Sequence, residues 1–445
     1  MRYDRRLTAG ALQFMQRFNI APYIIKASPD RLMDIGSEIV SYLMPEIKLL
    51  PQLVAPESPI GPFPPKIFLK FGLVASLLPR DLVEDYAEDE RVEKIFPDRL
   101  EFALQYPTVP PEGVYKARKR KKEYTFTTTA WTKRILGAEE ANEKGYDGAG
   151  VRVAVVDTGA SRIHNQLRGR VAFYSTILLQ HRDENGHGSW CATCIAGHKF
   201  KDTYLSIRAG KDVYCEGMAP GVHLIAVKSL GYYIGTGSSS QVIEGIDIAL
   251  KNKAQIISMS LGSSDPPETK PEDNAYYSVF EKCKEEGAIP VVANGNDGPG
   301  EGTVGSPGNM PNCLSVGAYD PVSGEVADFS SRGPTKWGDI KPDCIMPGVL
   351  IDSGTVGLTD LSGDGMLSRA SPISGTSMAT PHAAGMLALM AQAYRTKIHQ
   401  PLTLDEVKAM LEALKDHPKN NDGGWGVLTW SKIKDWASTQ YGVEL

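Results

Sequence analysis

The sequence predicts a three-layer α/β domain, with a parallel sheet between helices, preceded by a small α+β module. From Thr132 onward, short β-branched apolar runs alternate with amphipathic helical segments, which is typical of a parallel sheet covered on both faces. Before that point, strand and helix patterns follow in the order βαββαβ, which fits a ferredoxin-like module. Two units joined by a linker are therefore expected.

The small module is expected at residues 22–105, after a polar lead at 1–21. Its strands are predicted at 23–27, 47–54, 66–78 and 92–96, and its helices at 29–43 and 80–90. A linker at 106–130 follows, with prolines and a basic run at 116–122. Such a run is usually solvated; the alternatives are a protease-sensitive site or, less readily, a docking patch for anions.

The larger domain is expected at residues 131–445. Its strands are predicted at 151–157, 222–229, 255–260, 288–293 and 314–318, and its helices at 239–252, 274–286, 377–394, 404–414 and 432–437. In parallel sheets the functional residues gather at the carboxyl ends of the strands. Candidate site residues are therefore sought there.

Composition excludes several classes of function. The chain has 445 residues, 42% of them hydrophobic and 23% charged, with a net charge of −5, which describes a soluble globular protein with no overall attraction to nucleic acid. No apolar run approaches the ~20 residues that cross a bilayer, so no membrane partner is expected. The start lacks the apolar core of a secretory signal, which favours an intracellular protein unless another export route applies.

Six cysteines fall in the C-terminal two-thirds of the chain: Cys191, Cys194, Cys215, Cys283, Cys313 and Cys344. Cys191 and Cys194 have a C-x-x-C spacing, but no second Cys or His pair nearby completes a four-ligand zinc site. Disulfides among the six cannot be assigned from the sequence. Buried free thiols are the simpler interpretation.

The loop that begins the helix at 377–394 carries a candidate nucleophile, Ser377. A serine in the first turn of a helix lies where backbone N–H groups are unpaired and the helix dipole is positive. That end favours the anion that a carbonyl oxygen becomes under attack, and Gly375 leaves room for substrate backbone. Taken alone, the motif equally fits a Ser/Thr cap on a core helix.

The partners that such a serine needs occur at other strand ends. Asp157 ends a buried strand, His187 begins the next helix between two glycines, and Asn296 lies in a turn after a third strand. Each residue alone is weak evidence for a catalytic role, because Asp and Asn are common turn residues. Together, the order Asp, His, Ser is that of subtilisin among serine proteases.

On these motifs the chain from about Thr132 to Ala437 resembles the subtilisin-like serine proteases, the subtilases. The resemblance implies an endopeptidase with Ser377 as nucleophile, His187 as general base and acid, and Asp157 orienting the imidazole. Asn296, with the backbone N–H of Ser377, would donate to the oxyanion. The substrates implied are polypeptides, and the chemistry requires no cofactor.

Substrate-binding positions are carried over from the same resemblance. They comprise the two walls and base of the pocket for the residue before the cut (P1) and the edge strand that pairs with substrate backbone. In that order they are Ser260, Leu261, Gly262, Ala293, Asn294, Gly295, Gly305, Gly235, Thr236 and Gly237. The alternative interpretation of these glycines is turn chemistry. A deep glycine-lined pocket predicts broad cleavage after large apolar residues.

Two departures from the family pattern bear on metals and thiols. Cys191 follows the His187 box as in thiol-containing members, which would place a thiol beneath His187 and allow inhibition by mercurials. Gln166 stands where an aspartate commonly binds calcium, and the loop at 199–216 lacks the usual calcium-binding sequence. The metal residues are thus unknown, although the family allows a structural calcium ion.

The N-terminal module resembles the subtilase propeptide, which the resemblance implies is an intramolecular inhibitor removed by autoprocessing. The cut would fall near Leu104 to Pro107, or in the basic run near Lys122.

Two other functions are alternatives to an active endopeptidase. A non-catalytic binding protein on the same fold would be favoured by a broken triad, and an exopeptidase by a closed non-primed end of the cleft.

Overall fold

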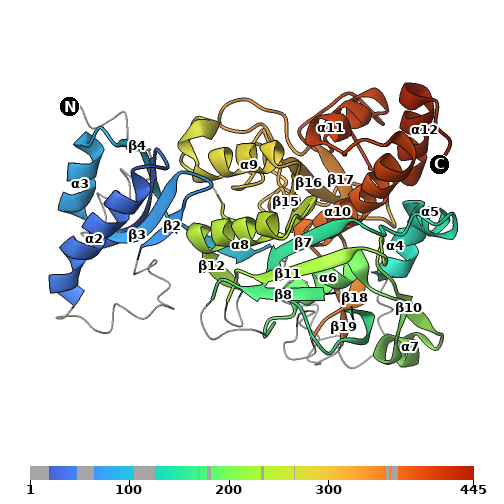
Figure 1. Ribbon diagram of the computed structural model, residues 1–445. Coiled ribbons are helices and arrows are strands. Elements are labelled where there is room, and N and C mark those ends of the chain that lie inside the picture. Colours follow the sequence, from blue (N-terminus) through green and yellow to red (C-terminus); the bar gives the residue numbers. More distant parts are fainter. Residues whose placement is uncertain are drawn as a thin grey trace.

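A computed structural model describes residues 20–47, 65–104, 126–167, 169, 171–177, 182–231, 235–264, 266–356, 361 and 369–445 (Figure 1). Several sequence predictions lie wholly or partly outside these residues: the lead at 1–21 up to residue 19, the linker at 106–130 up to residue 125 with its basic run at 116–122, the cut near Leu104 to Pro107 beyond Leu104, and the alternative cut near Lys122. The four triad and oxyanion candidates and all ten predicted substrate-binding positions lie inside them.

The N-terminal elements follow the predicted βαββαβ order. They are β1 (Ile20–Ala27), α2 (Leu32–Ile47), β2 (Lys66–Phe68), β3 (Leu73–Pro79), α3 (Arg80–Glu88) and β4 (Val92–Pro97). The strands form an antiparallel sheet in the order β2-β3-β1-β4. This is the small α+β unit expected from the sequence.

The prediction was wrong about the two central strands. The segment 66–78 is not one strand but the hairpin β2–β3, because the chain turns between Phe68 and Leu73. Phe71 N donates to Phe68 O, and Gly72 adopts a left-handed conformation (φ 69°) that a strand does not accommodate. A strand at 47–54 is contradicted at Ile47, which ends α2; residues 48–54 lie outside the described part.

The larger unit is built on a seven-stranded sheet in which every neighbouring pair is parallel. Its order is β17 (Cys344–Pro347), β16 (Leu314–Tyr319), β15 (Ile289–Ala293), β13 (Ile256–Met259), β7 (Arg152–Asp157), β11 (His223–Lys228) and β8 (Val171–Ser175). The five predicted strands are the central ones. The two edge strands, β8 and β17, were missed because neither carries a β-branched apolar run.

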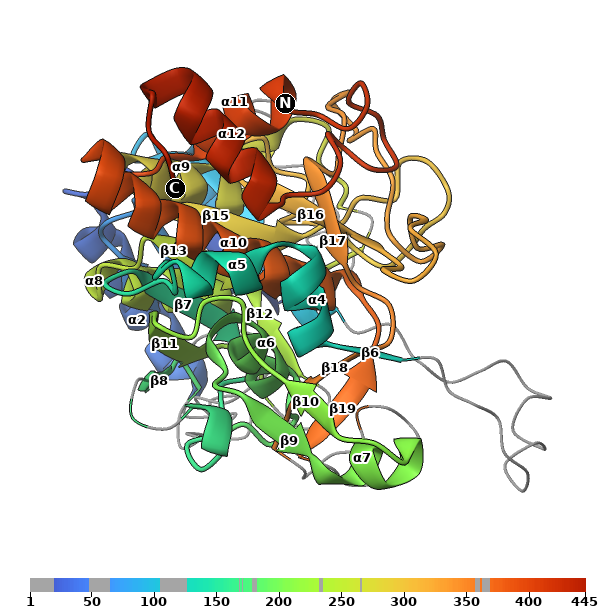
Figure 2. The ribbon, with the colours of Figure 1, turned by 90° about the vertical axis from the view of Figure 1, so that its right-hand side faces the viewer.

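Helices cover both faces of this sheet, which gives the predicted three layers (Figures 1 and 2). Strand β7 shows why: Val153 and Val155 pack in one core with α6 (His187–Ala196) and α10 (Thr376–Ala393). Ala154 and Val156 pack in a second core with α8 (Ser239–Lys251) and α9 (Ala275–Glu285). Successive residues of a strand point to opposite faces of the sheet. Because helices cover both faces, the residues on both must be apolar.

The N-terminal sheet packs onto the α8–α9 layer. Ile24, Phe68 and Phe96 share the apolar core of those helices, with Val242 of α8 and Phe280 of α9 among its members. In Figure 1 the module therefore lies beside α8 and α9, at the end of the molecule opposite α12.

The remaining elements surround these layers. The helices are α4 (Thr129–Ile135), α5 (Ala138–Glu143), η3 (Asn165–Leu167), α7 (Thr203–Ala209), η4 (Pro271–Asp273), η5 (Tyr394–Ile398), α11 (Leu404–Ala413) and α12 (Trp430–Tyr441). The strands form three small sheets: β9 (Phe200–Asp202) with β10 (Val213–Cys215); β6 (Thr127–Thr128), β18 (Ile351–Gly354) and β19 (Ala370–Ile373); and β12 (Thr236–Ser238), β5 (Leu100–Ala103) and β14 (Leu261–Gly262). Within the described ranges, no helix has both the length and the apolar character of a membrane span.

Candidate active site

The first two predicted triad residues meet at the carboxyl end of β7. Asp157 is the last residue of that strand, and His187 is the first residue of α6. The His187 Nδ1 atom lies 2.8 Å from Asp157 Oδ1, which also accepts from Thr158 N at 2.6 Å. Both side chains are fully buried. This pairing fixes the imidazole with its Nε2 atom directed away from the carboxylate.

The start of α6 is held in place by Asp183, which the sequence analysis did not single out. Its carboxylate accepts from Gly186 N at 2.7 Å and Ser189 N at 2.9 Å, so it satisfies free N–H groups at the helix start. Gly188 must be glycine here, because a Cβ would lie 2.1 Å from Gly159 O. Close contact between this helix and the β7 turn therefore positions His187.

Ser377 lies in the first turn of α10, at the carboxyl side of the same sheet. Its hydroxyl donates to the carbonyl oxygen of Ser260 at 2.8 Å, and not to His187. Among the described residues, the His187 Nε2 atom has no hydrogen-bond partner. The serine–histidine hydrogen bond that the predicted roles require is thus not formed in this structure, because the hydroxyl takes a different acceptor.

Asn296 has the orientation of an oxyanion donor. Its Oδ1 atom accepts from both Thr376 N and Thr376 Oγ1 at 2.9 Å, which directs the amide NH₂ into the cleft. There Nδ2 donates to the carbonyl oxygen of Leu104 at 3.0 Å. The amide orientation follows from this hydrogen-bond network. Thr376 was part of the predicted motif, but its role in holding Asn296 was not foreseen.

The strand β5, which ends at Ala103, lies in the cleft as a substrate would. It pairs antiparallel with β12 on one side and with β14 on the other. Beyond it, Ala103 N donates to Gly235 O at 3.0 Å and Leu104 N to Ser260 O at 3.2 Å. The positions predicted to bind substrate backbone therefore pair with the chain's own residues 100–104, which also cover the triad.

Two of the predicted glycines, Gly262 and Gly305, leave space in the pocket at Leu104 because they carry no side chain. A Cβ on Gly262 would lie 3.2 Å from Leu104 Cδ1, and one on Gly305 would lie 2.8 Å from Ser263 O. Asn294 contributes its backbone to the predicted wall. Its amide bonds Ser331 O and Ser315 Oγ inside the protein, so only its backbone faces the pocket side, where Asn294 O accepts from Gly305 N.

Cys191 lies beneath the imidazole, as the resemblance implies. Its sulfur is 3.9 Å from His187 Nδ1 and 3.6 Å from Ser377 O, and burial raises the pKa of the thiol well above its usual value. Asp157, His187 and Cys191 are close enough to offer ligands to one metal ion. All six cysteines are buried free thiols, as predicted.

The cleft contains a buried acidic residue, Glu101, that was not predicted from the sequence. It is 1% exposed, and its Oε1 atom accepts from Ser239 Oγ at 2.7 Å and Tyr276 OH at 3.1 Å. Burial raises the pKa of Glu101 to about 8. No sequence signal pointed to it, because a single acid in a short strand pattern is ordinary.

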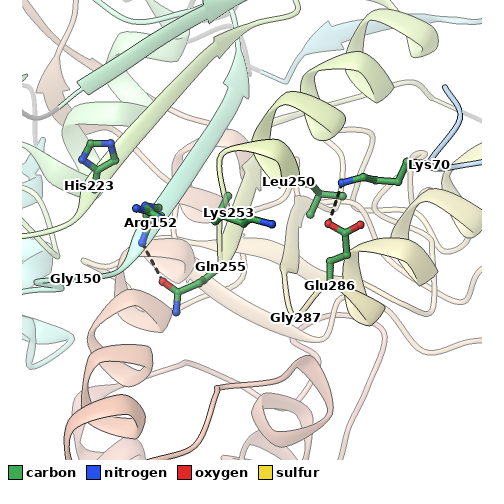
Figure 3. Close-up of a pocket in the computed structure, with 10 residues that line it drawn as sticks. Lys70, Gly150, Arg152, His223, Leu250, Lys253, Gln255, Glu286 and Gly287 are labelled. Atoms are coloured by element: carbon green, nitrogen blue, oxygen red, sulfur yellow. Dashed lines mark hydrogen bonds and ion pairs between the residues drawn. The ribbon is translucent and has the colours of Figure 1, made fainter. Parts of the chain in front are cut away.

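A cavity of about 880 Å³ lies away from the triad, at the amino ends of the strands (Figure 3). Arg152 and His223 begin β7 and β11 there, and Lys253 lies nearby. Lys70 of the N-terminal module reaches Glu286 across the rim at 2.9 Å. Because functional residues of parallel sheets gather at the other edge, this cavity is not part of the candidate active site.

Comparison with known proteins agrees with the geometry. The sequence profile described as "Subtilase family" matches residues 148–426, which contain Asp157, His187, Asn296 and Ser377. The chain belongs to the subtilase family. It therefore has the three-layer subtilisin-like fold and is a subtilisin-like serine endopeptidase, a hydrolase whose substrates are polypeptides and whose chemistry needs no cofactor.

Three relatives illustrate the similarity. The chain is 35% identical over 295 residues to serine protease AprX of Bacillus subtilis, covering 62% of this chain and 63% of AprX. It is 33% identical over 281 residues to a thermostable alkaline protease of Halalkalibacterium halodurans, covering 63% and 67%. With subtilisin E of Bacillus subtilis it shares 32% over 335 residues, covering 74% and 73%. The chain thus spans just under two thirds of AprX.

Proposed function

We propose that the chain is made as a self-processing zymogen whose N-terminal module occupies its own active site as a product-like inhibitor, with the cut after Leu104. The observation that carries this is the hydrogen bond from Asn296 Nδ2 to the Leu104 carbonyl oxygen. That oxygen occupies the position where an oxyanion would form on the P1 residue. Residues 101–104 would then be P4 to P1.

In the proposed mechanism Ser377 attacks the carbonyl carbon of the P1 residue. His187 Nε2 takes the hydroxyl proton and passes it to the leaving amine, while Asp157 stabilises the imidazolium that forms between the two steps. Asn296 and the backbone N–H of Ser377 donate to the oxyanion. Water then attacks the acyl-enzyme while His187 takes a proton from it. His187 returns this proton to Ser377 Oγ as the ester C–O bond breaks and the acid product leaves, so the enzyme is restored.

For this reaction the Ser377 side chain must turn about its Cα–Cβ bond. Its hydroxyl leaves Ser260 O and directs its proton to His187 Nε2, which has no hydrogen-bond partner among the residues that the structure describes. Hydrogen bonds between catalytic groups often tighten only when substrate is bound. The present orientation is also the one observation that favours the rival function, a non-catalytic binding protein on this fold.

The specificity we propose is broad, with a preference for large apolar P1 residues. Support comes from Leu104, whose Cδ1 atom lies against Gly262 without a side chain between them. A glycine at this position leaves the pocket deep, and contact between methylene groups discriminates only weakly between apolar residues.

Complementary charge supports the inhibitory role of the module. Four cations of the N-terminal elements pair with acids of the catalytic domain: Lys66 with Glu244, Lys70 with Glu286, Lys94 with Asp273 and Arg99 with Glu268. The Asp98 carboxylate also accepts from Ser240 N, at the start of α8, at 2.8 Å. Together with the shared apolar core, these contacts hold β5 in the cleft.

We also propose that calcium is not bound at the position of Gln166. The amide of Gln166 is buried against Gly197 and Gly354. The three acids of the loop 199–216 are already engaged: Asp202 caps α7, Asp212 pairs with Lys201 and Glu216 pairs with Lys133. Calcium requires six to eight oxygen ligands, which these groups do not supply together.

Intact mass and N-terminal sequencing of wild type, Ser377→Ala and Ser374→Ala test the proposed function. Wild type and Ser374→Ala should lose their first 104 residues, whereas Ser377→Ala should stay whole. Ser374 is the matched control, because it lies in the same loop but its hydroxyl only accepts from Leu350 N. If wild type stays whole, cleaves no denatured protein and does not react with a serine-directed phosphonate, the binding-protein function is favoured.

A further inference from the structure

The P4 position of the cleft holds an acidic side chain in a closed, polar pocket. On the proposed register Glu101 is P4, and its backbone pairs with Gly237 of the edge strand β12. Its carboxyl group enters a pocket that is lined by Ser239, Glu268 and Tyr276 of the catalytic domain and closed by Phe96, Pro97 and Arg99 of its own segment, with about 10 Å³ of free space. The side chain therefore fills the pocket.

On the side of the catalytic domain, the described residues that line the pocket offer hydroxyl groups and no cation; Arg99, which also lines it, belongs to the N-terminal segment. Ser239 Oγ and Tyr276 OH both contact Glu101 Oε1, while within the described residues Oε2 has no hydrogen-bond partner. Hydroxyls can donate to a carbonyl oxygen of a neutral acid or of an amide equally well. An ionised carboxylate with one oxygen unpaired is costly at such a site.

The charged groups around the pocket do not neutralise Glu101. Arg99 precedes it on the same segment, but its guanidinium is directed to the buried Glu268, with Nη1 2.9 Å from Oε2. Asp98 and Arg99 leave with residues 1–104 on processing, so the carboxylate of Glu268, which is 2% exposed in the uncleaved chain, then adds negative potential to the pocket. The pocket thus favours an uncharged occupant that carries a carbonyl oxygen.

We propose that the P4 subsite of this protease selects glutamine, or glutamic acid in its neutral form, through the hydroxyls of Ser239 and Tyr276. This inference rests on the proposed function, because it takes Leu104 as P1. It makes the cleavage rate of substrates with P4 glutamate dependent on pH. The rate for substrates with P4 glutamine, relative to substrates with other neutral P4 residues, should not change with pH.

The ionisation of Glu101 agrees with this geometry. Burial raises the pKa of Glu101 to about 8, and it raises the pKa of Asp98 to about 6. A free peptide carries an ionised P4 glutamate above about pH 4.5 and must take up a proton to bind. The preference for glutamate should therefore fall by at most about tenfold per pH unit between pH 4.5 and 8.

The test uses the full chain, incubated until intact mass shows that residues 1–104 are gone, and three anilide peptides Leu-X-Phe-Ala-Leu. With X as Gln, Glu or Leu, the measured quantity is the ratio of kcat/KM values, so that titration of the enzyme's own groups cancels. Gln should exceed Leu by about fivefold or more, as expected for two hydrogen bonds to one oxygen. The Glu-to-Gln ratio should fall from pH 6 to pH 8.

Two variants separate the hydroxyls from general effects. Tyr276→Phe and Ser239→Ala should each bring the Gln-to-Leu ratio towards one, and either suffices if the other fails to fold. Tyr277→Phe, on the same helix but outside the pocket, should retain the ratio. Cleavage of all three peptides with Leu equal to or better than Gln overturns the P4 inference alone. If no peptide is cleaved, the proposed function falls and this inference falls with it.

Discussion

The carbonyl oxygen of Leu104 accepts a hydrogen bond of 3.0 Å from Asn296 Nδ2. The N–H of the same residue, Leu104, donates to Ser260 O. These contacts fix the register of the cleft, since one residue then has both the backbone pairing and the oxyanion contact of P1. The roles assigned to the neighbouring side chains follow from this register and can be tested one by one.

Replacing Asn296 by Ala should lower kcat about 10²–10³-fold with little change in KM, because the amide donates to charge that develops only in the transition state. Kinetics on a peptide anilide measure this directly. Asp297→Ala is the matched control; its side chain bonds Ser264 Oγ at an exposed position. A rise in KM with kcat unchanged, and so an equal fall in kcat/KM, would indicate that Asn296 only binds substrate.

Thr376→Val should lower kcat by about fivefold, because it removes one of the two donors that hold Asn296 Oδ1. The Thr376 backbone N–H remains, so the loss should be smaller than for Asn296→Ala. Thr380→Val serves as control, since its hydroxyl bonds only Thr376 O one turn earlier. In a Thr376→Val/Asn296→Ala double variant the first change should have no further effect; full additivity would contradict the link.

Much of this site was predictable because subtilase motifs are local. Asp157 and His187 each follow a recognisable strand or glycine pattern, and the parallel sheet brings their strand ends to one edge. The hydroxyl rotamer of Ser377 was not predictable, because Ser260 O lies 117 residues away and competes with His187 for the same proton.

Other features of the structure could not be predicted from the sequence for similar physical reasons. The hairpin at residues 66–79 has the pattern of one mostly apolar strand, which Lys70 and the left-handed Gly72 interrupt at the turn. Glu101 became notable only when the N-terminal module docked and buried it between α8 and α9. Burial is a tertiary property, so no local pattern announced the raised pKa of this residue.

An organomercurial should inactivate the processed enzyme slowly, because the buried thiol of Cys191 lies against His187 and the Ser377 backbone. A bulky adduct there would displace the imidazole from Asp157. The measurement is residual activity against time, for wild type, Cys191→Ser and Cys194→Ser. Protection should occur with Cys191→Ser only, because Cys194 contacts the structural His382 instead. Protection by Cys194→Ser would assign the effect to that second thiol.

Removing calcium with a chelator should leave the melting temperature of the full Ser377→Ala chain unchanged. An ion present at 100 times its Kd would add about 2.7 kcal/mol and raise the melting temperature by several degrees. The comparison is thermal unfolding in EDTA and in millimolar calcium. Gln166→Asp on this background is the informative variant, since it restores the usual ligand type. A calcium-dependent rise in the Ser377→Ala chain that is lost with Gln166→Ala would contradict our proposal for this position.

The pH dependence of stability should reveal Glu101 in the uncleaved chain. Its pKa is raised from 4.5 to about 8 by burial, so the folded zymogen holds a proton that the unfolded chain releases. Below about pH 4.5 the carboxyl group is protonated in both the folded and the unfolded state, so the raised pKa lowers no stability there. As the pH rises from about 4.5 towards 8 the unfolded chain ionises first, and the free energy of unfolding falls by at most about 1.4 kcal/mol per pH unit. Above pH 8 both states are ionised and the loss levels off.

Comparing Ser377→Ala with Ser377→Ala/Glu101→Gln by urea unfolding isolates this effect, because glutamine does not titrate. The double variant should gain stability relative to the single variant as pH rises from 5 to 8, and the difference should then level off. Asp98→Asn provides a second check on the same background: burial raises the pKa of Asp98 to about 6, so its gain should level off near pH 6. A difference between single and double variant that is constant across this range would mean that Glu101 is ionised in the cleft.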